Sequence, residues 1–230
     1  MTAERHFPTI LTMERYAGND PGKTMKTQQI TGLAVFALAF IVLALPGERT
    51  RPASEPAGVT CRMVTGEGEI LIRVYPETAP LTAANFLRYV AAGLYDGTSF
   101  FRVVTPDNQP GDKVRIEVIQ GGDVAGEKCF PAIAHETTAL TGLKHEDGVI
   151  SMARAEPGTA TSSFFICVND QPELDFGGRR NPDGQGFAAF GRVVKGMDVV
   201  RRIQKLDQEK QLLKKPVTII SLAKLGTTPR

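Results

Sequence analysis

The chain has 230 residues, of which 42% are hydrophobic and 23% charged, which is ordinary for a globular protein. Its formal net charge is +2, and no run of Lys or Arg exceeds two residues. Because nucleic-acid binding depends on many phosphate contacts, this charge pattern predicts no nucleic-acid partner.

Residues 1–58 differ in character from the rest of the chain. Residues 33–45 form an uninterrupted apolar run, which is shorter than the roughly 20 residues of a membrane-spanning helix and fits the 7–15 residues of a secretory core. Met25 and Lys26 precede the run and suit a start with a basic flank, although no Ala-x-Ala site follows. A buried core helix is the weaker interpretation. We therefore expect residues 1–58 to be a signal or anchor segment with a flexible tether, and the protein to be exported, either free or tethered to a membrane through residues 30–45.

From residue 59 onward the pattern changes to short strands punctuated by turns. Pro80 suits the first position of a helix, and Gly93 suits its end. The expected apolar face of this helix is Leu81, Ala84, Phe86, Leu87 and Val90. A second helix is expected over 197–205. The expected strands cover 61–65, 70–75, 100–104, 114–120, 148–153, 163–168, 187–194 and 217–223, with Pro216 at the edge of the last one. Many short strands and few helices favour a closed or sandwiched β architecture.

The sequence offers no metal or redox motif. It has three cysteines and three histidines, without a C-x-x-C motif and without a common ligand spacing among the histidines (Cys61, Cys129 and Cys167; His6, His135 and His145). The prediction is therefore no cofactor and no metal. Cys167 lies in an apolar strand pattern and is expected to be a small core residue.

Three segments carry the residues most suggestive of chemistry: 99–104 (SFFRVV), 119–123 (IQGGD) and 158–167 (GTATSSFFIC). In this order they resemble the cyclophilin family of peptidyl-prolyl cis-trans isomerases, and the resemblance extends over about residues 59–225. It implies a mainly β fold, a closed eight-stranded antiparallel β-barrel capped by two α-helices, as a single domain over 59–230. It also implies isomerisation of X-Pro bonds during protein folding, without a cofactor.

Such a reaction needs no nucleophile and no general base. Amide resonance sets a barrier of about 18–20 kcal/mol, so the site must hold the twisted amide better than either planar form. In the twisted state the imide nitrogen regains its lone pair and accepts a hydrogen bond, which a guanidinium donates best in a pocket dried by aromatic rings.

The resemblance assigns a role to eight residues. Arg102 matches the catalytic arginine of the family, and Gln120 matches the glutamine that contacts the substrate backbone. Phe165 matches the floor of the proline pocket. The remaining substrate-binding positions are Leu174, Phe187, Val118, Ser163 and Ala153.

The chain also departs from the family pattern around the pocket. Glu117 and Glu173 replace usual aromatic residues, Ser163 replaces a common Gln, and residues 105–117 form an insertion rich in turn residues. These departures favour an alternative, a non-catalytic module that binds proline-containing peptides and acts as a chaperone on the same barrel. In either case we expect proline-containing polypeptides as partners and a monomeric protein.

Overall fold

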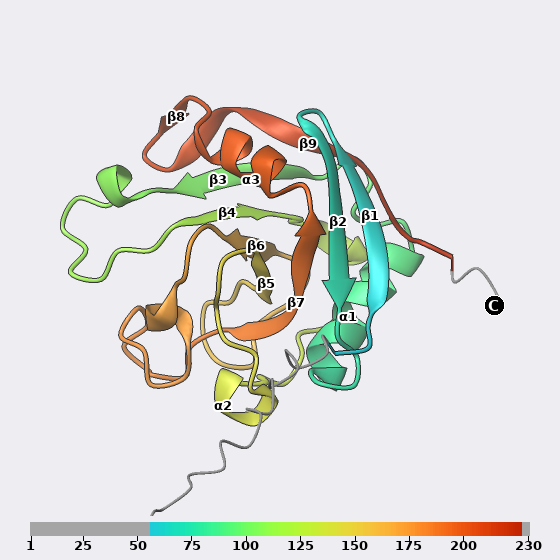
Figure 1. Ribbon diagram of the computed structural model, residues 1–230, viewed down its shortest axis with the longest axis horizontal. Coiled ribbons are helices and arrows are strands. Elements are labelled where there is room, and N and C mark those ends of the chain that lie inside the picture. The colour runs from blue at the N-terminus through green and yellow to red at the C-terminus, as the bar shows by residue number, and fades with distance from the viewer. Residues whose placement is uncertain (1–55, 227–230) are drawn as a thin grey trace, which may run out of the picture. The chain divides into compact units, whose positions relative to one another are not determined.

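The computed structural model describes residues 56–226, in which nine strands form one antiparallel sheet that closes on itself (Figure 1). Eight strands form the ring in the order β1-β2-β7-β5-β6-β4-β3-β9, and β9 pairs with β1 to close it. The ninth, β8, pairs with β9. The strands are β1 Val59–Thr65, β2 Gly68–Val74, β3 Ser99–Val104, β4 Val118–Gly121, β5 Val149–Met152, β6 Phe164–Cys167, β7 Ala188–Lys195, β8 Gln208–Glu209 and β9 Leu212–Lys224. The predicted closed eight-stranded barrel is confirmed.

Two main helices accompany the barrel, α1 (Pro80–Ala91) and α3 (Met197–Gln204), with a single helical turn α2 (Thr138–Thr141) between them in sequence. Figure 1 shows α1 and α3 at different ends of the barrel. Pro80 begins α1, and Phe86, Leu87 and Val90 are buried, as predicted. Two other positions of the expected apolar face are not buried: Leu81 is half exposed and Ala84 faces solvent. Tyr89 is buried in their place, because its hydroxyl accepts a hydrogen bond from the Phe130 N–H at 2.7 Å and so satisfies its polar end.

Three short 3₁₀ turns complete the described elements, and each lies in a connecting segment. They are η1 (Pro106–Asn108), η2 (Gly126–Lys128) and η3 (Pro172–Leu174). The first and third belong to the two loops that border the site described below. None of the three was expected from the sequence pattern.

Two predicted strand boundaries were wrong. β4 begins at Val118 rather than at residue 114, because the preceding residues belong to a loop closed by its own side-chain hydrogen bonds. β9 begins at Leu212 and contains Pro216 instead of starting after it. Pairing with β3 jumps from Val217 to Leu212, so Pro216 lies where the ladder is interrupted and its missing N–H removes no hydrogen bond.

Alternation along the strands divides the apolar side chains between the barrel interior and its outer face. In β6, Phe164 and Ile166 belong to the interior core, whereas Phe165 and Cys167 belong to a second cluster outside it. Phe86 of α1 closes the interior, with its ring centroid 4.9 Å from that of Phe190 and 5.7 Å from that of Phe164. Each such fully buried ring contributes about 1.5–3 kcal/mol through removal of apolar surface from water. The outer cluster is where the candidate site lies.

Across residues 56–226, no helix combines the length and apolar character needed to cross a bilayer. The apolar run 33–45, and with it almost all of the expected signal or anchor segment, lies outside the described residues.

Candidate active site

A β-bulge in β3 directs Arg102 to the outer face of the barrel. Phe100 pairs with Gly121 and Arg102 pairs with Gln120, so Phe101 is an extra residue on this strand. Phe100 and Val103 therefore both belong to the interior core, while Arg102 and Val104 lie outside. Bulges commonly re-aim side chains next to active sites in this way.

The register of three neighbouring strands brings the main predicted residues into one row. Arg102 of β3 faces Gln120 of β4, and Gln120 faces Phe165 of β6. Residues that face each other across antiparallel strands share a face of the sheet, with Cβ atoms about 4.5–5.5 Å apart. The guanidinium, the amide and the aromatic ring therefore lie side by side on the outer face.

This row lines a cavity of about 230 Å³ on the outer face of the barrel. Seven of the eight predicted site residues line it: Arg102, Val118, Gln120, Ala153, Phe165, Leu174 and Phe187. Its apolar wall is formed by packed side chains: Phe165 and Phe187 meet edge to face with ring centroids 5.2 Å apart, and Leu174 is fully buried. The cavity thus joins a small apolar recess to the guanidinium of Arg102, and Arg154 and Arg180 also line it.

Ser163 is the predicted residue that does not line the cavity, and it supports one that does. Its Oγ accepts a hydrogen bond from Gln120 Nε2 at 3.2 Å. Gln120 Oε1 in turn accepts one from Arg102 Nη1 at 2.9 Å. Ser163 therefore fixes the orientation of the Gln120 amide, so that its oxygen points to the arginine.

Arg102 is partly buried and its hydrogen-bond partners are neutral. Gln211 Oε1 accepts from Nε at 3.0 Å and from Nη2 at 2.5 Å, in addition to the Gln120 contact. Burial, followed by the nearby charge of Arg180, lowers the pKa of Arg102, and Asp112 opposes this shift. These three hydrogen bonds occupy three of the five N–H groups of a guanidinium, which leaves two without a partner among the described residues.

His145 supports the floor of the cavity. Its ring is stacked on Phe165 with centroids 6.0 Å apart and an interplanar angle of 17°. Nδ1 contacts Asp175 Oδ1 at 2.8 Å and Nε2 contacts Ser151 Oγ at 3.0 Å. Burial lowers the pKa of His145 despite the opposing effect of Asp175. This shift favours the uncharged ring at neutral pH, in the tautomer whose Nδ1–H donates to the carboxylate while Nε2 accepts from the serine. The ring packs against Phe165. No motif in the sequence indicates this role for His145.

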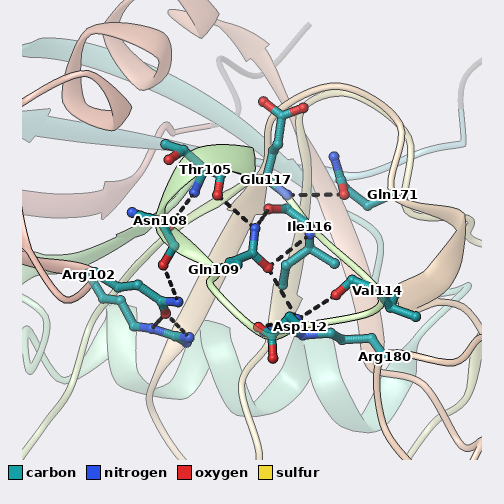
Figure 2. A network of polar contacts seen from close by, with 11 residues as sticks. Arg102, Thr105, Asn108, Gln109, Asp112, Val114, Ile116, Glu117, Gln171 and Arg180 are labelled. Carbon is teal, nitrogen blue, oxygen red and sulfur yellow. Dashed lines mark hydrogen bonds and ion pairs between the residues drawn. The ribbon is translucent and has the colours of Figure 1, made fainter.

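Two loops on the same side of the barrel build the rest of the wall (Figure 1). In the loop 105–117, the buried Gln109 side chain donates to the carbonyl oxygens of Thr105 and Ile116 and accepts from the Ile116 N–H. Arg180, from the loop between β6 and β7, donates to Val114 O at 2.7 Å and to Asp112 at 3.0 Å. Figure 2 shows how these contacts close the inserted loop and join it to Arg180. As a result, Ile116 and Arg180 line the cavity.

Arg154 fixes the position of Phe187. Its guanidinium carbon lies 5.2 Å from the Phe187 ring centroid, and it forms hydrogen bonds with both carboxylate oxygens of Asp183 at 2.7 and 3.0 Å. It also donates to Gly186 O. A Cβ at Gly186 would lie 2.5 Å from Leu174 O, and the backbone φ is +62°, so glycine is required for this close approach.

The two acidic departures at the rim have partners of their own. Glu173 pairs with Arg179 at 2.6 Å, which lowers the pKa of that carboxyl, chiefly through the Arg179 side-chain hydrogen bond. Glu117 Oε1 accepts a hydrogen bond from Asn169 at 3.2 Å. Neither residue lines the cavity.

Comparison with known proteins adds to this geometry. The family model described as "Cyclophilin type peptidyl-prolyl cis-trans isomerase/CLD" matches residues 60–224. Similar curated proteins include peptidyl-prolyl cis-trans isomerase cyp18 of Streptomyces antibioticus, 37% identical over 63% of this chain and 82% of the relative. Peptidyl-prolyl cis-trans isomerase B of Escherichia coli is 36% identical over 61% of this chain and 80% of the relative.

Solved structures show the same fold. A crystal structure of a cyclophilin-type isomerase from Cryptosporidium parvum has a TM-score of 0.60 at 20% identity and covers 74% of this chain and 99% of that one. A second crystal structure of that protein, solved in the presence of the dipeptide Ala-Pro, has a TM-score of 0.59 at 21% identity. It covers 73% of this chain and 99% of that one.

Proposed function

Because this chain belongs to the cyclophilin-type family of peptidyl-prolyl cis-trans isomerases and has that activity, we propose that Arg102 catalyses it at the cavity on the outer face of the barrel. One observation carries this assignment: a half-buried guanidinium with two N–H groups free among the described residues lines the same small cavity as Phe165 and Phe187. The proline ring of an X-Pro peptide occupies the apolar recess, and the free N–H groups address its imide nitrogen.

The selectivity for the twisted amide follows from hydrogen bonding. In either planar form the nitrogen lone pair is delocalised into the carbonyl and accepts no hydrogen bond. Twisting the bond localises the lone pair, so the contact with Arg102 forms as the barrier is reached and is lost afterwards. An interaction made only in the transition state raises kcat rather than ground-state affinity.

The remaining site residues hold the peptide. Phe165 and Leu174 form the floor and side of the recess, Phe187 closes it edge to face, and Val118 and Ala153 complete its apolar lining. Gln120, held by Ser163, is placed to contact the substrate backbone beside the proline. The relative solved in the presence of Ala-Pro supports a proline-containing peptide as the ligand.

A protease-coupled assay with a proline tetrapeptide tests the assignment. Catalytic amounts of the full-length protein should accelerate cis-to-trans conversion over the uncatalysed rate, and Arg102→Ala should remove most of this acceleration. Peptide binding with no acceleration by the parent would instead support the non-catalytic chaperone module and would overturn the catalytic role of Arg102.

We further propose that the protein acts on proline-containing polypeptides outside the cytoplasm, as a monomer that binds no nucleic acid. The apolar run 33–45, preceded by Lys26 and followed by a polar segment, supports export, with residues 30–45 as a membrane tether if they are retained. A C-terminal reporter that is active only in the cytoplasm should give no output on the full-length chain and should regain it when residues 33–45 are deleted. Strong output from the full-length fusion would contradict export.

A further inference from the structure

The second partner of Arg102 comes from a distant part of the chain. Gln120 lies on the neighbouring strand, whereas Gln211 lies in the turn between β8 and β9, 109 residues further along. Gln211 Oε1 accepts from both Nε and Nη2, and Gln120 Oε1 accepts from Nη1. Two acceptors on different edges of a planar group fix both its position and its plane.

The backbone of the turn is built to present this side chain. Lys210 and Gln211 have φ values of +50° and +73°, in a region that side-chain-bearing residues seldom adopt. Gln211 N–H donates to Gln208 Oε1 at 2.7 Å, and its carbonyl oxygen accepts from the Val103 N–H at 2.9 Å. The turn is therefore attached to β3 at the residue that follows Arg102. Backbone strain of this kind persists where surrounding contacts enforce it, and it is common at functional sites.

The other end of the Gln211 amide is also engaged. Nε2 donates to Asn108 O at 3.1 Å, and Asn108 is held by its own side chain, which accepts from the Thr105 N–H and donates to Val103 O. Asn108 is part of the loop 105–117, shown with Arg102 in Figure 2. Both ends of the amide thus have partners, so its oxygen cannot turn away from the guanidinium without the loss of two kinds of hydrogen bond.

We propose that Gln211 is a positioning residue for the isomerisation, holding the Arg102 guanidinium in the plane from which its free N–H groups address the X-Pro nitrogen. This inference rests on the proposed catalytic role of Arg102. Without the Gln211 oxygen, Arg102 keeps the Gln120 contact alone and its guanidinium rotates about the remaining bond. The fraction of molecules with a correctly aimed donor then falls, while the apolar recess that binds proline is unchanged.

A double-mutant cycle on the full-length protein tests the proposal. Gln211→Met keeps the side-chain volume and removes the acceptor, and Gln211→Ala serves as a second variant in case Met packs badly. Each should lower kcat about threefold to thirtyfold and leave KM within about twofold. This is less than the roughly tenfold to 160-fold that a whole hydrogen bond to a charged group is worth, because Gln120 still holds the guanidinium. Lys210→Asn is the matched control from the same turn, because Lys210 is exposed and Asn tolerates positive φ. It should leave kcat unchanged.

The decisive comparison is made in the Arg102→Ala background. If Gln211 acts through Arg102, Gln211→Met has no further effect there. An equal loss of kcat in both backgrounds, or a loss matched by Lys210→Asn, would assign Gln211 a merely structural role and overturn the proposal. If Arg102→Ala itself retains parental activity, the catalytic role of Arg102 fails, which is a separate and distinguishable result.

Discussion

Replacement of Arg102 by Ala removes the guanidinium proposed to address the imide nitrogen and tests the chemistry most directly. Three of its N–H groups are already bonded to Gln120 and Gln211, so the catalytic contribution comes from the remaining two. One hydrogen bond from a charged group contributes about 1.5–3 kcal/mol, and each 1.36 kcal/mol of transition-state stabilisation is worth tenfold in rate. We therefore expect Arg102→Ala to lower kcat/KM about tenfold to 160-fold, mostly through kcat.

The measurement is the protease-coupled assay, with folding checked by chemical denaturation. The variant leaves the Oε1 atoms of Gln120 and Gln211 without the arginine, but both residues are only partly buried and water can hydrate these oxygens. Stability should therefore fall by no more than about 1 kcal/mol. Arg102→Lys should recover little activity, since a compact ammonium cannot engage both amides in one plane.

Arg115→Ala is the matched control, because it removes an exposed arginine from the loop 105–117 without touching the cavity lining. It should retain parental kcat/KM. A folded Arg102→Ala protein with parental kcat/KM would refute the assignment of Arg102 as the catalytic group.

Three further predictions concern the pocket floor, pH and packing. Phe165→Ala, which opens the floor of the recess, should weaken proline-peptide binding in a titration and cost about 3 kcal/mol of stability; unchanged binding would exclude Phe165 from the pocket. Burial lowers the pKa of His145 in the folded protein. Below about pH 6.5 the His145 side chain is therefore protonated in the unfolded chain but not yet in the folded protein. The free energy of unfolding should consequently fall as the pH decreases, by up to about 1.36 kcal/mol per pH unit. His145→Gln should lose this component, and an identical slope in both proteins would contradict it. Gly122→Ala should lower the free energy of unfolding, measured in urea, by more than about 2 kcal/mol, because its Cβ would lie 2.3 Å from the Phe164 ring at φ +74°. The control Gly97→Ala, at φ +83° with open space around it, should lower it by about 1 kcal/mol. Equal losses would show that the Phe164 ring moves aside.

Local pattern in the sequence determined most of the elements. Short segments punctuated by turns predicted the eight strands of the ring, six of them to within two residues at each end, and Pro80 marked the start of α1. The exceptions have physical causes. The last residues of the loop 105–117 were predicted to be a strand, because Val114 and Ile116 alternate with charged residues. In the structure, the buried Gln109 side chain hydrogen-bonds to the Ile116 backbone and holds this segment as a loop. The buried face of α1 was predicted only in part: Tyr89 is buried through a polar contact with Phe130, which a hydrophobic pattern does not register.

The candidate site was also predicted only in part from the sequence. Arg102, Gln120 and Phe165 could be identified from the sequence because they lie within short motifs whose spacing resembles a known family. The arrangement of these three side chains in space could not be predicted from the sequence, since strict alternation along β3 would place Arg102 on the same face as Phe100, inside the barrel. The bulge at Phe101 reverses that assignment, and a bulge depends on pairing with β4 rather than on β3 alone.

The residues that hold the site in place were decided by tertiary structure alone. His145 lies beneath Phe165, Arg180 reaches across to Val114, and Gln211 meets Arg102 from 109 residues away. Each is an ordinary polar residue in the sequence, without a motif or a periodicity to distinguish it. Such contacts arise when closure of the barrel brings distant loops together, and the free energy that selects them comes from burial and hydrogen bonding in the folded state, which no local window of sequence contains.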